Sequence, residues 1–208
     1  FRYIHGADPR DAASVDRPFR WPVKRDARKL RVGVASDLFA RDRSKDADKE
    51  DDRAALAEWA ANDIRTLDEL RQAGVALTPV KLPSDLPVSS LGVILMAEAA
   101  AAFDELTRSG KDARLVRQVA DAWATVFREG QLVPAVEYLR ANRIRTLLLR
   151  ATEHALAELD VLVAPSFAGD TLLLTNLTGH PALCLPNGFR RDGLPTSFTL
   201  IGKLHGDA

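Results

Sequence analysis

Apolar and polar positions along the chain change their spacing several times, and these changes divide it into four stretches. Residues 1–29 show no regular apolar period. Between Gly6 and Pro22 they are rich in Asp, Arg and Pro, a composition that predicts an extended, turn-rich connecting segment. The three stretches that follow, residues 30–82, 89–158 and 159–204, each carry a periodic pattern.

Residues 30–82 have the pattern of a strand, a helix and a second strand. Apolar side chains alternate with others from Leu30 to Ala35, which is the period of a strand. The second predicted strand, Val75–Val80, contains Pro79, a residue that suits the edge of a sheet, and a right-handed parallel crossover is the usual connection. Between them an apolar stripe at helical spacing ends before Gly74; it consists of Leu56, Trp59, Ala60, Ile64, Leu67 and Leu70. The charged residues 41–53 before this stripe are predicted to form a solvated loop that runs into the start of the helix.

Residues 89–158 are predicted to form three helices. Ser89 or Ser90 can cap the first, which extends from Leu91 to about Thr107 and stops at Gly110. The second is expected to end at Gly130 and to place on one face Leu115, Val116, Val119, Ala122, Trp123, Val126 and Phe127.

The third predicted helix starts near Pro134, a residue that suits a first helical turn. Its expected buried stripe is Ile144, Leu147, Leu148, Ala151, Ala155 and Leu159. Because Trp59 and Trp123 both lie on such stripes, we expect both indole rings to pack in the core.

Residues 159–204 return to the pattern of strands. Leu159 to Ala164 is a short, mostly apolar run that Pro165 ends. Residues 182–186 and 197–201 are predicted to be two further strands, joined as an antiparallel pair by the turn residues 191–194. Strands at both ends with helices between them predict a single α/β domain with a mixed sheet covered by helices.

Composition narrows the class of protein. The 208 residues are 46% hydrophobic and 28% charged, as in ordinary globular domains. Lys and Arg number 29, as do Asp and Glu, so the formal net charge is zero and no nucleic-acid partner is expected. The longest apolar stretch, Leu91–Phe103, contains Glu98 and is shorter than the roughly 18 residues of a membrane span, so no membrane association is expected.

The cysteine content predicts the cellular compartment, and the first residue bears on whether the chain has been processed. Its one cysteine, Cys184, excludes an internal disulfide and fits a cytoplasmic location. The chain begins at Phe1 rather than at Met, so we expect it to be processed or a fragment.

Several catalytic motifs are missing from the sequence. None of the four histidines, His5, His154, His180 and His205, has a partner at the spacing of a zinc site, so no metal is expected. No glycine-rich phosphate loop follows a predicted strand, so no nucleotide cofactor is expected. A Gly-x-Ser-x-Gly nucleophile elbow is also absent.

The most unusual segment is Pro165–Pro186, which leaves one predicted strand by a loop and enters the next strand through residues 176–181. It contains Asp170 as its one carboxylate. Loops beyond strand ends are where α/β proteins usually bind ligands, so this segment is the best candidate site. Within it, His180 lies between Gly179 and Pro181; a structural role in the turn is favoured, and a position facing a pocket stays open.

These residues resemble the C-terminal signature of the amidase signature enzymes. The similarity extends from Gly6 to Gly202, and it rests on the order and spacing of its pieces rather than on any one of them. The matching pieces are, in chain order, Gly6–Phe19, Leu30–Val34, Ala141–Arg145, Asp160–Ser166, Thr175–Leu183, Pro186–Phe189, Asp192–Pro195 and Leu200–Gly202.

The resemblance implies hydrolysis of the C–N bond of a carboxylic amide by a Lys–Ser–Ser triad. One serine is the nucleophile, the second bridges it to a lysine base, and glycine-rich backbone amides stabilise the oxyanion. The family carries these groups upstream in a Gly-Gly-Ser-Ser-Gly-Gly-Ser-type segment that this chain lacks, and Ser89-Ser90 has no flanking glycines. We therefore expect a partial amidase signature fold without its N-terminal catalytic segment, with no catalytic residue of its own and inactive alone.

The resemblance also implies a substrate and partners. In the family the loop after the position of Pro165 approaches the substrate, so Asp170, Thr171 and Asn176 are expected to form one wall of a pocket for a small-molecule amide. The N-terminal portion of the same enzyme is the expected partner, and a homodimer is left open. No cofactor is expected. Expressed alone, the chain should expose sheet edges and self-associate or be poorly soluble.

Other interpretations stay open. The glutaminase component of a glutamyl-tRNA amidotransferase belongs to the same family and releases ammonia from glutamine. That activity needs a cation for the glutamine carboxylate, and Arg117, Arg143 and Arg145 could equally be surface charges of helices. A non-catalytic assembly module is a third interpretation. A nucleotide-binding α/β domain would need phosphate-binding glycines that the sequence lacks.

Overall fold

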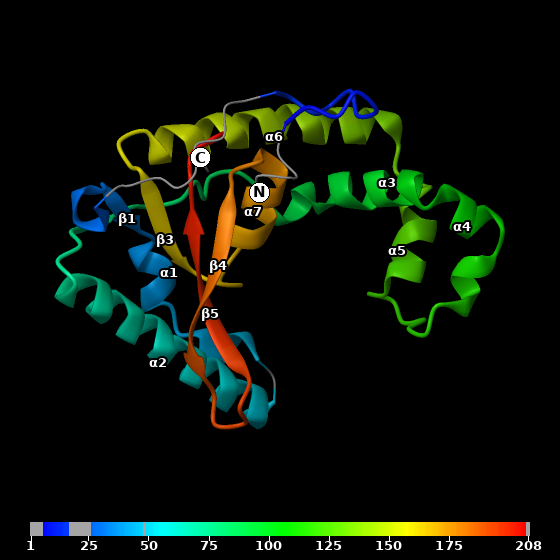
Figure 1. Ribbon diagram of the computed structural model, residues 1–208. Coiled ribbons are helices and arrows are strands. Elements are labelled where there is room, and N and C mark those ends of the chain that lie inside the picture. The colour runs from blue at the N-terminus through cyan, green and yellow to red at the C-terminus, as the bar shows by residue number, and fades with distance from the viewer. Residues whose placement is uncertain (1–5, 17–25, 48, 207–208) are drawn as a thin grey trace.

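The protein is a mixed five-stranded sheet with helices on both faces (Figure 1), as the sequence predicts. The computed structural model describes residues 6–16, 26–47 and 49–206. The predicted connecting segment therefore lies partly outside the described residues, and its described part contains turns around Pro9 and Ala12.

The order of the strands in the sheet is β2-β1-β3-β5-β4. The strands are β1 (Val32–Val34), β2 (Leu77–Pro79), β3 (Val161–Pro165), β4 (Ala182–Phe189) and β5 (Pro195–Ile201). β1 pairs in parallel with β2 and β3, while β5 pairs antiparallel with β3 and β4. The predicted parallel crossover, the edge position of Pro79 and the antiparallel C-terminal pair are all confirmed.

The helices include two, at Ser36–Ala40 and Thr171–Thr178, that the sequence analysis did not predict. In chain order the helices are α1 (Ser36–Ala40), α2 (Glu50–Gln72), α3 (Gly92–Ala102), α4 (Asp104–Arg108), α5 (Trp123–Gly130), α6 (Ala135–Leu156) and α7 (Thr171–Thr178), with 3-10 turns η1 (Ala27–Lys29), η2 (Arg43–Asp46), η3 (Ser89–Leu91) and η4 (Lys111–Arg114). Three acidic residues occupy the first turn of α2, where they interact favourably with the helix dipole, and Gly74 ends the helix at φ +84.

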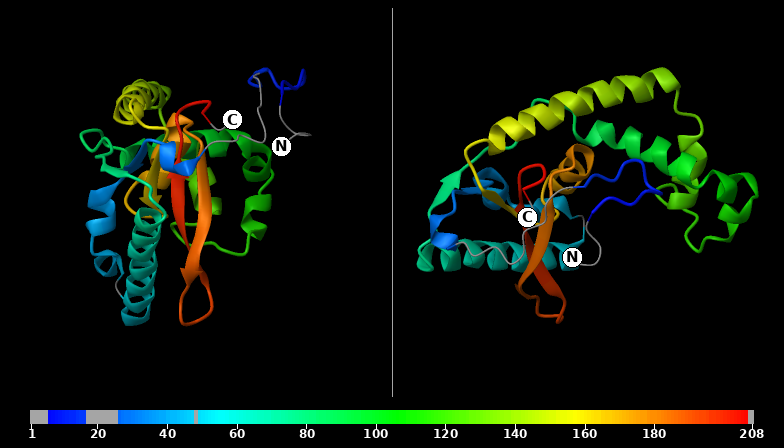
Figure 2. Two further views of the ribbon diagram at one scale, coloured as in Figure 1. Left: turned by 60° about the vertical axis from the view of Figure 1, so that its left-hand side comes forward. Right: turned by 45° about the horizontal axis from the view of Figure 1, so that its top comes forward.

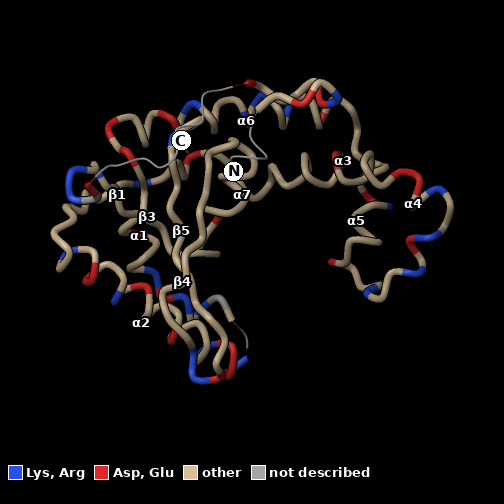
Figure 3. The backbone as a smooth tube through the Cα atoms, in the orientation of Figure 1, with Lys and Arg blue, Asp and Glu red and all other residues tan. Residues whose placement is uncertain are grey.

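Helices α2 and α6 cover opposite faces of the sheet. On one face, Leu67 of α2 packs with Val32, Val34 and Val163. On the other face, Leu156 at the end of α6 packs with Leu162, Ala164 and Ile201, and a third cluster joins α3, α6 and α7. The strands carry no charged residue, and Figure 3 shows the charges on the helices and the β4–β5 turn instead. For β1 and β3, whose residues are almost all buried, this distribution is what burial of both faces requires.

Helices α3, α4 and α5 form an arm that extends away from the sheet, as Figures 1 and 2 show. We call residues 92–130 the arm. The first predicted helix is broken in two at Phe103. The prediction that the second begins near Leu115 is wrong: residues 115–122 are irregular, with Val116 fully exposed, and α5 starts at Trp123.

Other side-chain predictions also need correction. Trp123 is 53% exposed and so is not a core residue. Ser89 and Ser90 make no capping hydrogen bond to a helix. On α6 the most buried residues include Thr152 and Leu156, while Leu147, predicted to be buried, is 53% exposed. Among the described residues, no helix is both long enough and apolar enough to cross a membrane.

Candidate functional site

The carboxyl ends of β1, β2 and β3 lie at one edge of the sheet because the three strands are parallel. The segments that leave this edge are the start of α1, residues 82–88 after β2, and residues 166–170 after β3. Ligands of open α/β sheets usually bind at this edge. The predicted loop after Pro165 therefore starts at the expected place.

Residues Ser166–Asp170 make a sharp corner between β3 and α7, which we call the β3–α7 corner. Both Phe167 and Gly169 have φ of 56, in the left-handed region. Glycine adopts this conformation freely, but for Phe167 it costs on the order of 1–2 kcal/mol. Because such strain persists only when neighbouring contacts impose it, the corner is a constrained part of the molecule.

The segment beyond the corner is a helix, which corrects the prediction of a loop. In α7 the hydroxyl of Thr175 donates to the carbonyl of Thr171 at 3.1 Å, and that of Thr178 donates to Leu174 at 2.8 Å. Leu174 is buried between α3 and α6, and Gly179 ends the helix at φ +78. The apolar period of residues 172–177 and the final glycine were signals for this helix that its threonine content obscured.

A small cavity of about 190 Å³ lies at the carboxyl edge of the sheet. Segments following all three parallel strands line it. Its lining residues are Asp37, Leu38, Leu82, Pro83, Ser84, Leu86, Val88, Asp170, Thr171 and Leu174. Two carboxylates therefore lie beside an otherwise mostly apolar surface, an arrangement suited to N–H groups attached to an apolar body.

Two of the three predicted site residues line this cavity. Asp170 is exposed, and its two carboxylate oxygens each accept a hydrogen bond of 3.0 Å from the Ser89 hydroxyl. Ser89 thus binds the predicted site residue instead of capping a helix. Thr171 is buried, and its hydroxyl donates to the carbonyl of Ala168 at 3.0 Å.

The third predicted residue, Asn176, does not line the cavity. Its side-chain amide donates to the carbonyl of Leu172 at 2.9 Å, one turn earlier on α7. His180 is buried next to α7, with Nδ1 2.7 Å from the Thr178 hydroxyl and Nε2 2.8 Å from Glu153 of α6. The favoured structural role of His180 agrees with these contacts.

A buried ion pair lies behind the β3–α7 corner. Arg43 and Asp63 are both about 95% or more buried, and Arg43 Nη1 donates to Asp63 Oδ2 at 3.1 Å. Arg43 Nη2 donates to the carbonyl of Ser166 at 3.1 Å, and its guanidinium carbon lies 5.0 Å from the centre of the Trp59 ring. The prediction of a solvated loop for residues 41–53 is thus wrong for Arg43, which fixes the first residue of the corner.

Burial dominates the electrostatics of this pair. It raises the pKa of Asp63 from 3.8 to about 6, against smaller opposing effects of the Asn187 hydrogen bond and the Arg43 charge. The carboxyl group therefore remains mostly ionised at neutral pH, and the ion pair with Arg43 persists there.

The network continues into the β4–β5 hairpin. Asn187 donates to Asp63 Oδ1 at 2.9 Å, and Thr196 donates to Asn187 Oδ1 at 2.7 Å. Asn62 donates in turn to the Thr196 hydroxyl at 2.9 Å. Helix α2, the irregular point of β4 next to Gly188 and the corner are therefore joined by one set of buried and partly buried hydrogen bonds.

The sequence analysis missed Arg43, Asp63 and Phe167. One signal was available: Asn62, Asp63 and Thr66 interrupt the buried face of α2 with polar side chains, and all three are buried. Buried polar groups require partners. Nothing in the local pattern identified Arg43 as the partner, because it lies among other charges of residues 41–53.

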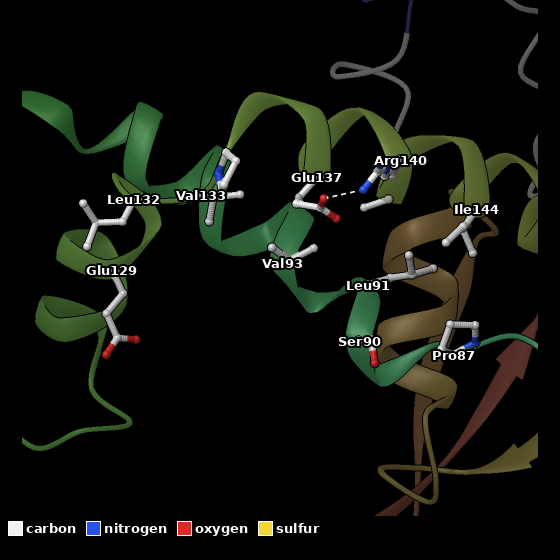
Figure 4. A pocket seen from close by; sticks show the side chains of 12 residues that line it. Pro87, Ser90, Leu91, Val93, Glu129, Leu132, Val133, Glu137, Arg140 and Ile144 are labelled. Carbon is white, nitrogen blue, oxygen red and sulfur yellow. Dashed lines mark hydrogen bonds and ion pairs between the residues drawn. The ribbon is translucent and has the colours of Figure 1, made fainter.

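A larger groove of about 560 Å³ lies where the arm meets α6, between η3, the start of α3 and the first turns of α6 (Figure 4). Its walls are mainly apolar, with Leu91, Leu132 and Ile144 among them. Its charged residues include Glu137 and Arg140, which pair with each other at 2.7 Å. Glu129 is a third charged residue of this groove, so polarity does not separate it from the cavity at the sheet edge; the cavity is the better candidate site because it lies at the carboxyl ends of the parallel strands. No group of three or more His, Cys, Asp or Glu able to hold a metal occurs among the described residues.

The sequence matches a family model described as Amidase over residues 1–175. Among curated proteins, it is 28% identical to an amidase of Pseudomonas putida, over 91% of this chain and 43% of that protein. It is 29% identical to the GatA-type component of the glutamyl-tRNA(Gln) amidotransferase of Roseiflexus sp. (strain RS-1), over 97% of this chain and 47% of that protein. The chain thus spans under half the length of these curated relatives.

The fold matches solved structures of the same kind. A bacterial aryl acylamidase belonging to the amidase signature enzymes superposes with a TM-score of 0.66 at 18% identity, over 97% of this chain and 46% of that one. At this level of identity the superposition supports the fold alone. It agrees with the partial fold that the sequence predicts.

Proposed function

Because the chain belongs to the amidase family, we propose that it supplies one wall of the substrate pocket of an enzyme that hydrolyses the C–N bond of a carboxylic amide. The observation that carries this proposal is the family match over residues 1–175. The cavity at the carboxyl edge of the sheet supports it, because it is small, mostly apolar and edged by carboxylates.

Asp170 is the proposed polar contact of this wall. Its carboxylate is exposed at the cavity and accepts from Ser89, so it can also accept from an N–H group of a substrate. Thr171 contributes to the wall next to it. The role that fits Asn176 is stabilisation of α7, because its amide already binds the carbonyl of Leu172.

The nucleophile and its base are proposed to lie outside this chain. The hydroxyl of Ser166 is buried 2.7 Å from that of Thr199, and the hydroxyl of Ser89 donates to a carboxylate. Neither arrangement provides the lysine-linked serine pair that the family resemblance implies. An in-frame lysine and a glycine-flanked Ser-Ser segment are expected upstream of Phe1 in the gene.

The rest of the same enzyme is the proposed partner, and β4 is the proposed contact. Among the described residues β4 pairs with β5 alone. Leu183 and Phe189 of this edge strand are 56% and 72% exposed. A further strand could pair with this edge and cover these side chains, as closure of a sheet edge requires.

The test is an amidase assay on the polypeptide encoded by the complete reading frame. We expect release of ammonia from small amides such as acetamide and benzamide, and none from residues 1–208 alone. Asp170→Asn should raise KM about tenfold while kcat falls less than threefold, since a neutral side chain accepts a weaker hydrogen bond. Failure of the complete polypeptide to hydrolyse any amide, or absence of the upstream Ser-Ser segment, would contradict the proposal.

A glutaminase of the amidotransferase type is the second candidate. It is favoured by the curated relatives, since several are GatA-type components of glutamyl-tRNA(Gln) amidotransferases at 25–29% identity. Arg117, one of the arginines considered for the glutamine carboxylate, pairs with Asp121 on the arm at 2.7 Å. Ammonia release from glutamine in preference to benzamide would favour this candidate over a general amidase. A non-catalytic module would release no ammonia from either compound.

A further inference from the structure

The outer side of helix α6 carries a row of exposed side chains. The inner side is occupied by packing, with Leu148 and Leu156 buried against the rest of the molecule. In both views of Figure 2, α6 lies on the outside of the molecule with no described helix or strand over its outer side. Residues three and four positions apart share one side of a helix, so the exposed outer residues form a single row, which we call the α6 stripe. It consists of Val136, Leu139, Arg140, Arg143, Thr146, Leu147, Arg150 and His154.

The α6 stripe is cationic, although the chain as a whole has no net charge. It contains three exposed arginines and no Asp or Glu. Arg140 pairs at 2.7 Å with Glu137 on the flank of the helix. Among the described residues, no carboxylate pairs with Arg143 or Arg150. Two guanidinium groups are therefore free to bind carboxylates of another molecule, and the guanidinium fork matches a carboxylate with two parallel hydrogen bonds.

The same stripe has an apolar component. Val136, Leu139 and Leu147 are each more than half exposed. Along the helix, aliphatic and cationic side chains alternate from Leu139 through Arg143 and Leu147 to Arg150, over about 17 Å at the rise of an α-helix. A second helix packed alongside α6 would meet both kinds of group along one line. The complement of this surface is an acidic helix with aliphatic side chains on the same face.

Two other kinds of anionic partner fit the α6 stripe less well. A helix that lies on a membrane keeps its cations on one face and its apolar residues, often Trp or Phe, on the other. The α6 stripe places arginines between its aliphatic residues and contains no Trp, Tyr or Phe. A nucleic acid is contacted mainly through its phosphates, which would leave Leu139 and Leu147 exposed. A protein helix satisfies both the charge and the apolar surface.

We propose that the α6 stripe is a docking surface for a partner protein that presents an acidic helix with aliphatic side chains on the same face. Carboxylates of the partner bind Arg143 and Arg150, and its aliphatic side chains cover Leu139 and Leu147. This inference does not depend on the proposed amidase function, because no residue of the stripe lines the cavity at the sheet edge.

The first test uses the polypeptide encoded by the complete reading frame and a stapled, fluorescein-labelled peptide helix with leucine and glutamate on one face. Fluorescence anisotropy should show saturable binding of this acidic peptide and none of a peptide in which lysine replaces each glutamate. Raising the NaCl concentration from about 50 to about 500 mM should weaken the binding several-fold, because exposed charges are screened. Absence of saturable binding overturns the inference.

A charge exchange tests whether the peptide binds at the α6 stripe. The double variant Arg143→Glu, Arg150→Glu should raise the Kd for the acidic peptide about tenfold and create binding of the lysine peptide. That gain also shows that the variant is folded. Leu147→Ala should raise the Kd about fivefold, because the peptide no longer covers a leucine. Arg114→Glu, the matched control, reverses an exposed arginine of η4 and should leave both affinities within twofold. An equal effect of the control would make net charge the cause and overturn the inference.

Three further measurements can contradict the inference by assigning the stripe to another occupant. Binding of phosphatidylserine vesicles or double-stranded RNA that the double variant abolishes, without binding of the acidic peptide, would assign it to a lipid surface or a nucleic acid. Light scattering that shows a dimer dissociated by the double variant would assign it to a second copy of this chain. Protection of Arg143 and Arg150 from phenylglyoxal in the complete polypeptide alone would show that its upstream portion covers the stripe.

Discussion

At the residue scale, the ion pair of Arg43 and Asp63 constrains the fold and also carries an energetic cost. Both side chains are almost completely buried, so each has lost its hydration. The raised pKa of Asp63 measures this loss, because burial outweighs the hydrogen bond from Asn187 and the charge of Arg43. The pair therefore fixes geometry more than it contributes stability.

The raised pKa predicts a specific dependence of stability on pH. Since the folded state holds the Asp63 proton up to about pH 6 and the unfolded state releases it near 3.8, the folded state binds more protons between these values. The contribution of Asp63 to the free energy of unfolding is therefore fully present below pH 3.8 and lost as the pH rises through 6. The total change is about 3 kcal/mol, since one pKa unit corresponds to about 1.4 kcal/mol.

Asp63→Asn isolates this effect, because asparagine does not titrate. The free energy of unfolding of wild type minus that of the variant should decrease as the pH rises from 4 to 7, measured by urea denaturation at each pH. Asp68→Asn, which removes an exposed carboxylate from the same helix, is the control for a general effect of charge on α2. A difference that increases with pH would mean that the attraction of Arg43 outweighs burial.

At the element scale, the close approach of α5 to α3 depends on one glycine. A Cβ atom at Gly130 would lie 2.5 Å from the carbonyl oxygen of Met96 and 2.7 Å from Cβ of Ala100, both on α3. The first of these is a backbone atom, so the clash cannot be relieved by rotation of a side chain. The two helices would have to move apart.

Gly130→Ala is expected to destabilise the arm by about 2 kcal/mol. Hydrogen exchange should increase in α5 and the facing turns of α3, with little change in the sheet. Gly92→Ala is the matched control, because a Cβ there meets no atom within 4 Å and alanine favours a helix, so it should be neutral or slightly stabilising. Equal stability of the two variants would show that α3 and α5 can separate without cost.

The same arm shows why some elements could not be predicted from apolar spacing. The stripe of residues 115–122 fits a helix, yet the Gln118 side chain donates to the carbonyls of Asp112 and Leu115. The second of these carbonyls would be needed for the first turn of that helix. Side-chain hydrogen bonds of this kind compete with helical ones, and their geometry is absent from a pattern of apolar positions.

The sheet and the position of the candidate site could be predicted from the sequence more fully than the helices of the arm. Apolar runs and turn residues predicted all five strands, because β1 and β3 are buried on both faces of the sheet and a turn joins β4 to β5. The position of Asp170 beyond β3 followed from strand direction. The hydrogen bonds between Arg43, Asp63 and Asn187 could not be predicted from the sequence, since they join residues 20 to 124 positions apart.

At the scale of the whole molecule, the strand β4 is incomplete as the edge of a sheet. It is eight residues long, uncharged, and has exposed apolar side chains at Leu183 and Phe189. Natural proteins usually protect such edges with charges, with short strands or with a covering element. β4 carries a proline, Pro186, and a bulge between Pro186 and Gly188 in its second half, and both oppose strand pairing, but its first half, residues 182–185, has none of these devices.

The chain of residues 1–208 is therefore expected to self-associate when expressed alone, through β4. Leu183→Lys should shift the distribution towards monomer in size-exclusion chromatography with light scattering, because an edge lysine opposes strand pairing. Leu194→Lys adds the same charge at a similarly exposed site in the β4–β5 turn and should not. If both variants act equally, net charge is the cause, and if wild type is monomeric at about 100 μM, the edge needs no cover. Suppression of self-association by the segment encoded upstream would identify that segment as what covers β4, the arrangement that the amidase function proposed here requires.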